Sequence, residues 1–212
     1  MEKIVVIGAG GFGREVLWLL RDINNHAPAW DVVGMLDDYA DASQIDGVPL
    51  LGKVQRFAEF DDCRFVIAFG SPESKASVVR EHLAPLDPSR FATLIHPTAI
   101  VADSAVIGPG GIVCAYNVIS VQTQLGAHVT LNLSCTIGHD SVLGDFCSVM
   151  PGCNISGNVR IGRSVYVGTG AKFIHQVDVG DESTVGAGAV VIRNVDAKQT
   201  VVGNPARAIV RK

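Results

Sequence analysis

The chain has 212 residues, a net charge of −4 at pH 7, 48% hydrophobic residues and only 18% charged residues. This length is enough for one large hydrophobic core or two modest ones. No basic run of the kind that follows a phosphate backbone is present, which excludes nucleic acid as an expected partner. Glycine is frequent, with 23 residues, and a regular repeat with tight turns would explain this excess.

The sequence predicts neither a membrane span nor a signal peptide. No apolar stretch reaches the roughly 18–20 residues that cross a bilayer. The apolar start MEKIVVIGAG is short and runs directly into a glycine turn, which favours a buried first strand. The five cysteines form no CxxC pair, and their odd number indicates reduced, mostly buried thiols. We therefore expect a cytoplasmic protein.

Residues 1–90 predict a small Rossmann-like α/β unit with a parallel sheet. The expected strands cover residues 3–7, 31–36 and 64–69, and the expected helices cover residues 14–22 and 74–83. Strands that alternate with helices in this way are typical of a parallel sheet covered by helices.

The turn between the first strand and the first helix reads Gly8-Ala-Gly10-Gly-Phe-Gly13, which is a GxGxxG match. Such a turn presents backbone N–H groups and a helix N-terminus to an anionic group. The pair Asp37-Asp38 ends the next strand, where a ribose or base is read. The favoured interpretation is a mononucleotide site. NAD binding by an oxidoreductase is an alternative, although the unit has room for about half a dinucleotide fold. A glycine turn needed only for strand–helix packing is another.

From Ile95 onward the chain repeats in steps of six residues. Every sixth residue from Ile95 to Val191, seventeen in all, is apolar, and the residue after it is often glycine. A period of six fits neither a helix nor an ordinary strand. It fits a short strand and a tight turn, in which glycine allows backbone conformations that a Cβ would penalise. Three such strands make an 18-residue coil, and successive coils pair about 4.8 Å apart. Residues 91–212 are therefore predicted to form a parallel β-helix.

The 18-residue coil places residues 18 apart in one column. Cys135 and Cys153 fall in an interior column, and they are interpreted as small core residues because no basic partner is placed beside them. His139 follows an inward apolar position by two residues, so its side chain is expected to point outward beside Asp140. Gly157 is expected to stack on His139 one coil away, leaving the backbone open to a ligand.

Over nearly all of its length, the sequence resembles a family of sugar acetyltransferases. This family includes sialic acid O-acetyltransferases and bacillosamine-type UDP-4-amino-sugar N-acetyltransferases. The motifs that carry the resemblance are IGAGGFGREV at the start, GMLDD, VIAFGSPESK, the hexapeptide repeat, GHD and the ending GNPAR. Proteins with this repeat form left-handed β-helices, so the resemblance implies that handedness. A pocket for acetyl-CoA on a flat β-helix face needs a second wall, which a three-fold neighbour would supply, and we expect a homotrimer.

The resemblance implies transfer of an acetyl group from acetyl-CoA to the amine of a nucleotide-linked sugar. His139 would be the general base, Asp140 would raise its basicity, and the backbone N–H of Gly157 would stabilise the oxyanion. The residues that would hold the nucleotide-sugar are Gly10, Gly11, Phe12, Asp37, Asp38 and Gly70, with Asn132 close by in the pocket. Those that would contact acetyl-CoA are Ser148, Thr169 and Ala187.

These residue types suit the chemistry. The attacking amine or hydroxyl must lose a proton, and a histidine that ionises near neutral pH serves best as the base. The adjacent carboxylate favours the imidazolium form. The developing oxyanion needs a fixed N–H donor.

Three other functions stay open. The first is a sialic acid or other sugar O-acetyltransferase, which would use the same residues. Ser148 and Phe12 stand where some relatives have histidine, and these two differences leave the identity of the sugar open. His175 should stand two coils from His139, about 10 Å away. A zinc site like that of γ-class carbonic anhydrases would need a third histidine, which Gly180 and its neighbours do not offer, so no metal is expected. A β-helix used only as an oligomeric scaffold would leave the nucleotide-like unit unexplained.

Overall fold

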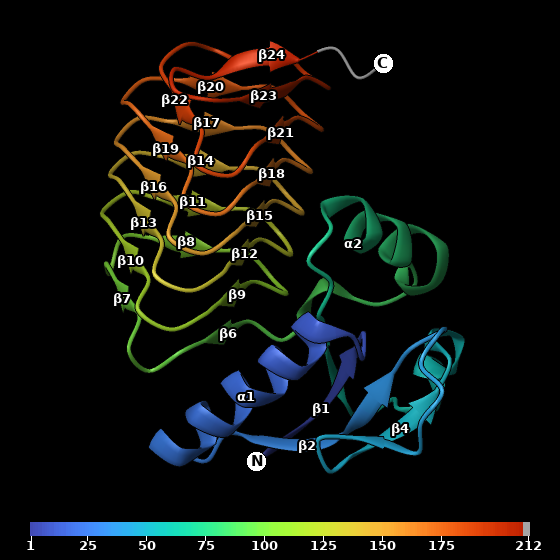
Figure 1. The fold of residues 1–212 in the computed structure, drawn as a ribbon. Coiled ribbons are helices and arrows are strands. Elements are labelled where there is room, and N and C mark those ends of the chain that lie inside the picture. The colour runs from blue at the N-terminus through green and yellow to red at the C-terminus, as the bar shows by residue number, and fades with distance from the viewer. Residues whose placement is uncertain (210–212) are drawn as a thin grey trace.

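The computed structural model describes residues 1–209, which form an α/β unit followed by a long β-helix (Figure 1). The N-terminal sheet has the strand order β3-β4-β2-β1-β5. Its strands are β1 (Glu2–Ile7), β2 (Trp30–Leu36), β3 (Gln44–Ile45), β4 (Val48–Gly52) and β5 (Arg64–Ile67). The pairs β1–β2, β1–β5 and β2–β4 are parallel, and β3–β4 is antiparallel. The central parallel strands are as predicted, whereas the β3–β4 hairpin was not predicted.

The helices of the α/β unit differ in extent from the predicted ones. Helix α1 (Gly11–His26) begins within the glycine turn and ends four residues later than expected. Helix α2 (Pro72–Val78) begins two residues early because Ser71 caps it and a proline occupies its first turn. A π-helical turn (Val79–Leu83) then replaces the expected regular helix. Short 3₁₀ turns cover Val54–Glu59 and Pro88–Arg90.

The β-helix has three faces, and its coils repeat every 18 residues. The first face consists of β7 (Ile100–Val101), β10 (Val118–Ile119), β13 (Thr136–Ile137), β16 (Asn154–Ile155), β19 (Lys172–Phe173) and β22 (Val190–Val191). The second face consists of β8 (Val106–Ile107), β11 (Gln124–Leu125), β14 (Val142–Leu143), β17 (Arg160–Ile161) and β20 (Asp178–Val179). The third face consists of β6 (Leu94–Ile95), β9 (Ile112–Val113), β12 (Thr130–Leu131), β15 (Ser148–Val149), β18 (Tyr166–Val167), β21 (Thr184–Val185), β23 (Thr200–Val202) and the antiparallel β24 (Arg207–Ile209).

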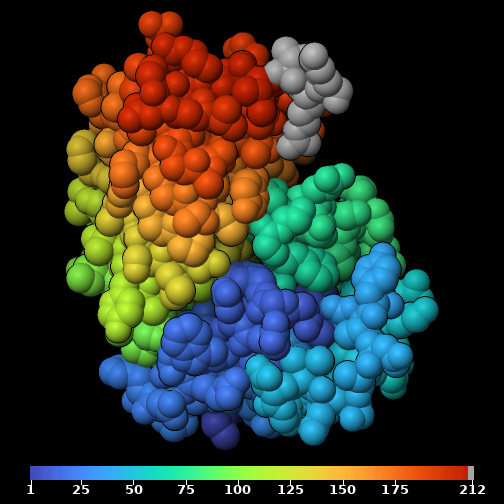
Figure 2. Space-filling model, viewed as in Figure 1, coloured from blue at the N-terminus to red at the C-terminus, as the bar shows by residue number. Residues whose placement is uncertain are grey.

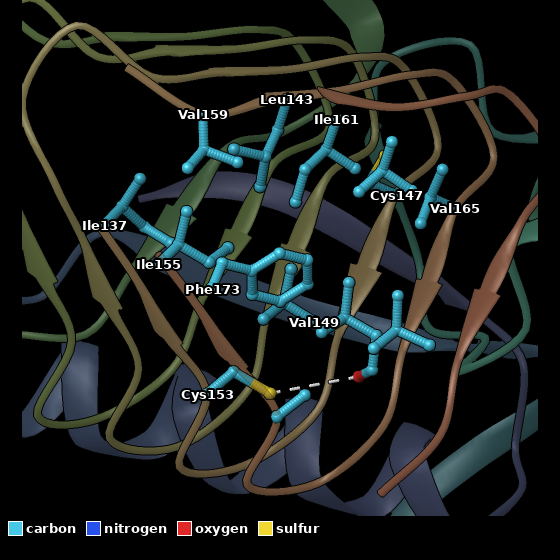
Figure 3. Close-up of a cluster of buried hydrophobic side chains, with 14 of the residues drawn as sticks. Ile137, Leu143, Cys147, Val149, Cys153, Ile155, Val159, Ile161, Val165 and Phe173 are labelled. Carbon is cyan, nitrogen blue, oxygen red and sulfur yellow. Dashed lines mark hydrogen bonds between the residues drawn. The ribbon is translucent and has the colours of Figure 1, made fainter. Parts of the chain in front are cut away.

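The predicted apolar column fills the interior of the β-helix (Figure 3). From Val113 to Val191, every sixth residue is at most 3% exposed. Ile95, at 38%, and its partly exposed equivalents in the first coil lie at the open end of the stack, where no earlier coil covers them. Cys135 and Cys153 are fully buried in this core, as expected of small core residues.

The glycines that follow the apolar positions have a different cause from the one predicted. None of them has a positive φ, because the left-handed residue of each turn lies two positions later, at residues such as Asp140. These glycines are instead required by close stacking of the coils. A Cβ at Gly138 would lie 2.5 Å from the backbone nitrogen of Gly157 in the next coil, a distance that real Cβ atoms do not reach.

The α/β unit docks on the third face of the β-helix. Helix α1 packs its apolar side on Leu94, Ile112 and Cys114 at the start of this face. Further along, α2 lies beside the same face, and the outward side chains of Thr130 and Ser148 are buried there. The first and second faces remain free of the α/β unit, as Figure 1 shows.

Candidate active site

A cleft of about 500 Å³ opens at the carboxyl ends of β1, β2 and β5. Its lining includes all six residues expected to hold a nucleotide-sugar in the α/β unit, namely Gly10, Gly11, Phe12, Asp37, Asp38 and Gly70. Ligands of open α/β sheets bind in this position. The N-terminus of α1 adds backbone N–H groups and the positive end of a 16-residue helix.

The glycines that border the cleft have two different roles: some are required by the fold, and others leave space for a ligand. Gly8 has a φ of +107°, and a Cβ at Gly13 would lie 2.2 Å from the carbonyl oxygen of Gly8, so these two glycines are required by the fold. A Cβ at Gly10, Gly11 or Gly70 would meet nothing within 4 Å. The last three therefore leave open space along the cleft, which suits close approach of a phosphate to the backbone.

The two aspartates at the end of β2 also differ in role, one serving the fold and the other facing the cleft more freely. Asp37 accepts hydrogen bonds from the backbone nitrogens of Ala9, Tyr39 and Ala40 at 2.7–2.8 Å, so both of its oxygens are occupied by the fold. Partial burial acts to raise the pKa of Asp37, but these three donors outweigh it and hold the pKa below its ordinary value. Asp38 accepts one bond, from the nitrogen of Val54 at 3.0 Å through Oδ1. Asp38 is thus the freer acceptor at the cleft.

His139 lies at the corner between the first and second faces, which we call the histidine corner (residues 138–141, 156–159 and 174–177). Its Nδ1 lies 2.7 Å from Oδ2 of Asp140, and both side chains are about half exposed. Asp140 has a φ of 57°, a left-handed conformation that aspartate tolerates. With Nδ1 held by the carboxylate, Nε2 is the ring nitrogen available to a substrate.

Gly157 lies directly beside the imidazole ring, one coil further along. A Cβ at Gly157 would lie 2.5 Å from Nε2 of His139 and 2.6 Å from Cε1. The N–H of Gly157 has no hydrogen-bond partner among residues 1–209, while its carbonyl accepts a bond from Gln176 at 3.2 Å. The corner therefore combines an available ring nitrogen with a free backbone donor in the next coil.

The residues expected to contact the acetyl donor lie elsewhere on the β-helix. Thr169 and Ala187 are exposed and stack one coil apart at the corner between the third and first faces, which we call the threonine corner (residues 132–135, 150–153, 168–171 and 186–189). Asn132 belongs to this corner but is 6% exposed, and its Oδ1 accepts a bond from the nitrogen of Leu133. Ser148 is fully buried under the α/β unit, so in this chain its hydroxyl faces no solvent.

A single chain does not bring these groups together. The nucleotide cleft is lined only by residues of the α/β unit, between Gly10 and His82. The turn after β13, which carries His139, lies across the β-helix from α2 (Figure 1). The cleft and the histidine corner are thus separate places on one protomer. The threonine corner borders the α/β unit, because its Leu133 packs against the cluster around α1 and its Met150 shares a groove with Ser71.

Two buried basic groups at the domain interface had no predicted role. Burial lowers the pKa of Lys75, on α2, to about 7. The pKa of His128 is lowered to about 4, mainly by burial and then by the charge of Lys75, while the charge of Asp145 acts in the opposite direction. The His128 ring stacks on Phe146 with centroids 5.1 Å apart. Lys75 belongs to the motif VIAFGSPESK, but only its burial reveals that it contacts the β-helix.

Two other groups could carry chemistry, the thiol of Cys147 and the imidazole of His175. Burial raises the pKa of Cys147 to about 12, which makes this thiol a poor nucleophile. His175 is exposed, and among residues 1–209 no three His, Cys, Asp or Glu side chains gather where they could hold a metal ion. Within the same range, no helix has the length and apolar character needed to span a bilayer.

Two family models match the chain. The PglD N-terminal domain matches residues 3–82, and the bacterial transferase hexapeptide (six repeats) matches residues 158–193. The chain is 29% identical to a GDP-perosamine N-acetyltransferase of Escherichia coli O157:H7, over 81% of this chain and 77% of the relative. It is 33% identical to a UDP-N-acetylbacillosamine N-acetyltransferase of Bacillus subtilis (strain 168), over 54% of this chain and 52% of the relative.

Solved structures are similar over the whole chain. The acetyltransferase domain of PglB from Neisseria gonorrhoeae FA1090, in complex with acetyl coenzyme A, is 31% identical with a TM-score of 0.88, covering 98% of this chain and 99% of that one. A second structure of the same domain is 32% identical with a TM-score of 0.89, covering 99% of this chain and 100% of that one. A perosamine N-acetyltransferase from Caulobacter crescentus, in complex with CoA and GDP-perosamine, is 26% identical with a TM-score of 0.88, covering 99% and 97%. These likenesses confirm the predicted fold, an α/β unit followed by a left-handed β-helix.

Proposed function

The chain belongs to the family of hexapeptide-repeat sugar acetyltransferases of the bacillosamine type, and from this premise we propose that it transfers the acetyl group of acetyl-CoA to the amine of a nucleotide-linked amino sugar. The observation that carries the proposal is the histidine corner. An imidazole held by a carboxylate at 2.7 Å stands beside a glycine whose N–H is free, which is the pair of groups that acyl transfer requires.

Each group at the histidine corner has a defined task. Acetyl-CoA supplies the acetyl group as a thioester, and the sugar amine forms the new C–N bond while the thiol of CoA leaves. Nε2 of His139 accepts the proton that the attacking amine loses, and Asp140 holds the ring through Nδ1. The N–H of Gly157 donates to the oxyanion that develops on the carbonyl oxygen. A Cβ at Gly157 would overlap the imidazole, so the glycine allows the ring to lie directly against this backbone.

The acceptor binds in the cleft of the α/β unit. Its pyrophosphate lies over Gly10 and Gly11, where the backbone is open and the N-terminus of α1 points, and its nucleoside lies toward Asp38. Both oxygens of Asp37 are used by the fold, which supports a structural task for that residue.

A complete site needs more than one protomer, and we propose a homotrimer. The acceptor cleft and His139 are separated on one chain, so a neighbouring chain has to bring them together. Exposed apolar side chains beside the histidine corner support such contacts: Ile100 (66%), Val106 (61%), Val118 (39%) and Val121 (51%). With three chains side by side, the histidine corner of one faces the threonine corner of the next. The five free, buried cysteines support a cytoplasmic location.

The experiment is a panel of acceptors assayed with acetyl-CoA by release of free thiol. UDP- and GDP-linked amino sugars are compared with the corresponding free amino sugars and with free sialic acid. We expect acetylation of a nucleotide-linked amino sugar and little turnover of the free sugars, because the nucleotide supplies binding energy at a distance from the amine. Efficient acetylation of free sialic acid, with nucleotide-linked amino sugars inert, would establish O-acetylation instead.

A further inference from the structure

Lys75 is a buried lysine that ties the α/β unit to the β-helix. Its side chain leaves α2 and is 1% exposed. Nζ donates to the carbonyl oxygen of His128 at 2.7 Å, to Oγ1 of Thr130 at 3.1 Å and to the carbonyl oxygen of Cys147 at 3.0 Å. All three acceptors belong to the β-helix, in two successive coils, and they use all three hydrogens of an ammonium group.

This burial is costly and is not explained by an ion pair. Burial lowers the pKa of Lys75 to about 7, which measures how unfavourable the buried charge is. No carboxylate among residues 1–209 forms a salt bridge with it. An apolar side chain would fill the same space at lower cost, so the three directional hydrogen bonds are the feature that distinguishes lysine here.

The position of α2 matters because the helix lines two adjoining hollows. Ser71, Ser74 and Ser77 line the acceptor cleft. Ser71 and Ser77 also line a groove of about 1,020 Å³ whose opposite wall is the β-helix, including Met150 and Tyr166. Figure 2 shows the segment that contains α2 lying against the β-helix. A shift of α2 therefore changes the cleft and its distance from the β-helix together.

The remaining docking contacts lie mainly at the start of the third face, where Oδ2 of Asp22 on α1 lies 3.2 Å from Nε2 of His96. Helix α1 meets the start of the third face through apolar side chains such as Leu19, which pack on Leu94 and Ile112. Apolar packing is non-directional and permits small rotations. The Lys75 hydrogen bonds lie further along the same face and fix the second point of attachment.

We propose that Lys75 is a positioning residue, which holds the acceptor cleft in register with the catalytic β-helix through its three hydrogen bonds. This inference rests on the proposed function. It acts through geometry alone: Lys75 fixes the cleft on the β-helix of its own chain, and the proposed trimer sets that β-helix beside the histidine corner of a neighbour. Reacting atoms must approach to about 3–3.5 Å, and a misplacement of about 1 Å costs on the order of 10² in rate.

The test is Lys75→Met, which keeps the apolar stem and removes the donors. We expect kcat to fall at least about tenfold, with KM for both substrates and the Kd for the free nucleotide within about threefold of wild type. Lys3→Met, which removes an exposed lysine, and Val179→Ala, which destabilises the core of the β-helix, should leave kcat unchanged. If kcat of Lys75→Met stays within twofold of wild type while the melting temperature falls, the residue is merely structural.

A measurement without substrates separates this proposal from the proposed function. Hydrogen exchange of the amides in residues 72–83 should be at least about tenfold faster in Lys75→Met, while exchange in β1 and β16 stays unchanged. If wild-type protein acetylates no nucleotide-linked amino sugar, the proposed function is wrong. The exchange result then decides by itself whether Lys75 holds α2 on the β-helix. Unchanged exchange in residues 72–83 would overturn the proposal for Lys75.

Discussion

Gly157→Ala is expected to displace the proposed base without removing it. The new methyl carbon would stand 2.5 Å from Nε2 of His139, whereas ordinary contacts begin near 3.4 Å, so the imidazole must move by about 1 Å. The backbone at Gly157 is outside the left-handed region, so alanine adopts it without strain. A displacement of about 1 Å costs on the order of 10² in kcat, or about 2.7 kcal/mol of transition-state stabilisation.

The assay is steady-state acetyl transfer by wild type, Gly157→Ala, His139→Ala and the double variant. Because the methyl group acts by moving the imidazole, it should have little further effect once the imidazole is absent. Thermal unfolding of Gly157→Ala should stay close to wild type, since the half-exposed ring of His139 is free to turn aside. Two results would refute this reasoning: kcat of Gly157→Ala within twofold of wild type, or an equal fold-reduction in kcat by the methyl group in the His139→Ala background. Either would show that the stacking of Gly157 on His139 does not affect catalysis.

Three further predictions concern the fold and the assembly. Asp37→Asn should lower the free energy of unfolding at pH 7 by about 1–3 kcal/mol, because an amide nitrogen cannot accept the bond from Ala9, whereas Asp38→Asn should cost less. The pKa of Asp37 lies below its ordinary value, so Asp37 stabilises the folded state above about pH 4, and this stabilisation is lost as the pH falls further. In urea titrations, the difference in unfolding free energy between wild type and Asp37→Asn should therefore shrink below about pH 4. Because burial lowers the pKa of His128 to about 4, wild type should lose about 3 kcal/mol of stability as the pH falls from 6.5 to 4, and a loss of equal size in His128→Phe would contradict this. Sedimentation should give a native mass of three times 22.3 kDa, and a monomer at working concentration would exclude the trimer.

The parts of the structure that repeat were predictable from the sequence. A hydrophobic period of six over seventeen positions indicates one architecture, and each coil from Val113 to Val191 buries its apolar residue as expected. The same register placed Gly157 one coil from His139, because a column at a spacing of 18 needs no information about distant contacts. The GxGxxG turn likewise predicted a helix N-terminus at this point, and α1 begins at Gly11.

The contacts between the two units were not predictable from local pattern. Lys75 reads as a solvated helical lysine, and only its burial on the third face shows that it meets the carbonyl oxygen of His128. Ser148 occupies an outward position of the repeat, yet α2 covers it. The pair of aspartates reads as one acidic patch, whereas the fold uses the oxygens of Asp37 and leaves Asp38 freer. Each of these outcomes depends on how separate elements pack, which no periodicity records.

The most direct test of the central claim is the effect of His139→Ala on the two substrates separately. We predict that kcat falls by about 10² or more, because the proton acceptor is lost. The thermal shift on titration with acetyl-CoA and the Kd for the nucleotide should stay within about threefold of wild type, because the donor and the nucleotide are bound mainly elsewhere. A kcat within threefold of wild type would contradict the assignment of His139 as the base.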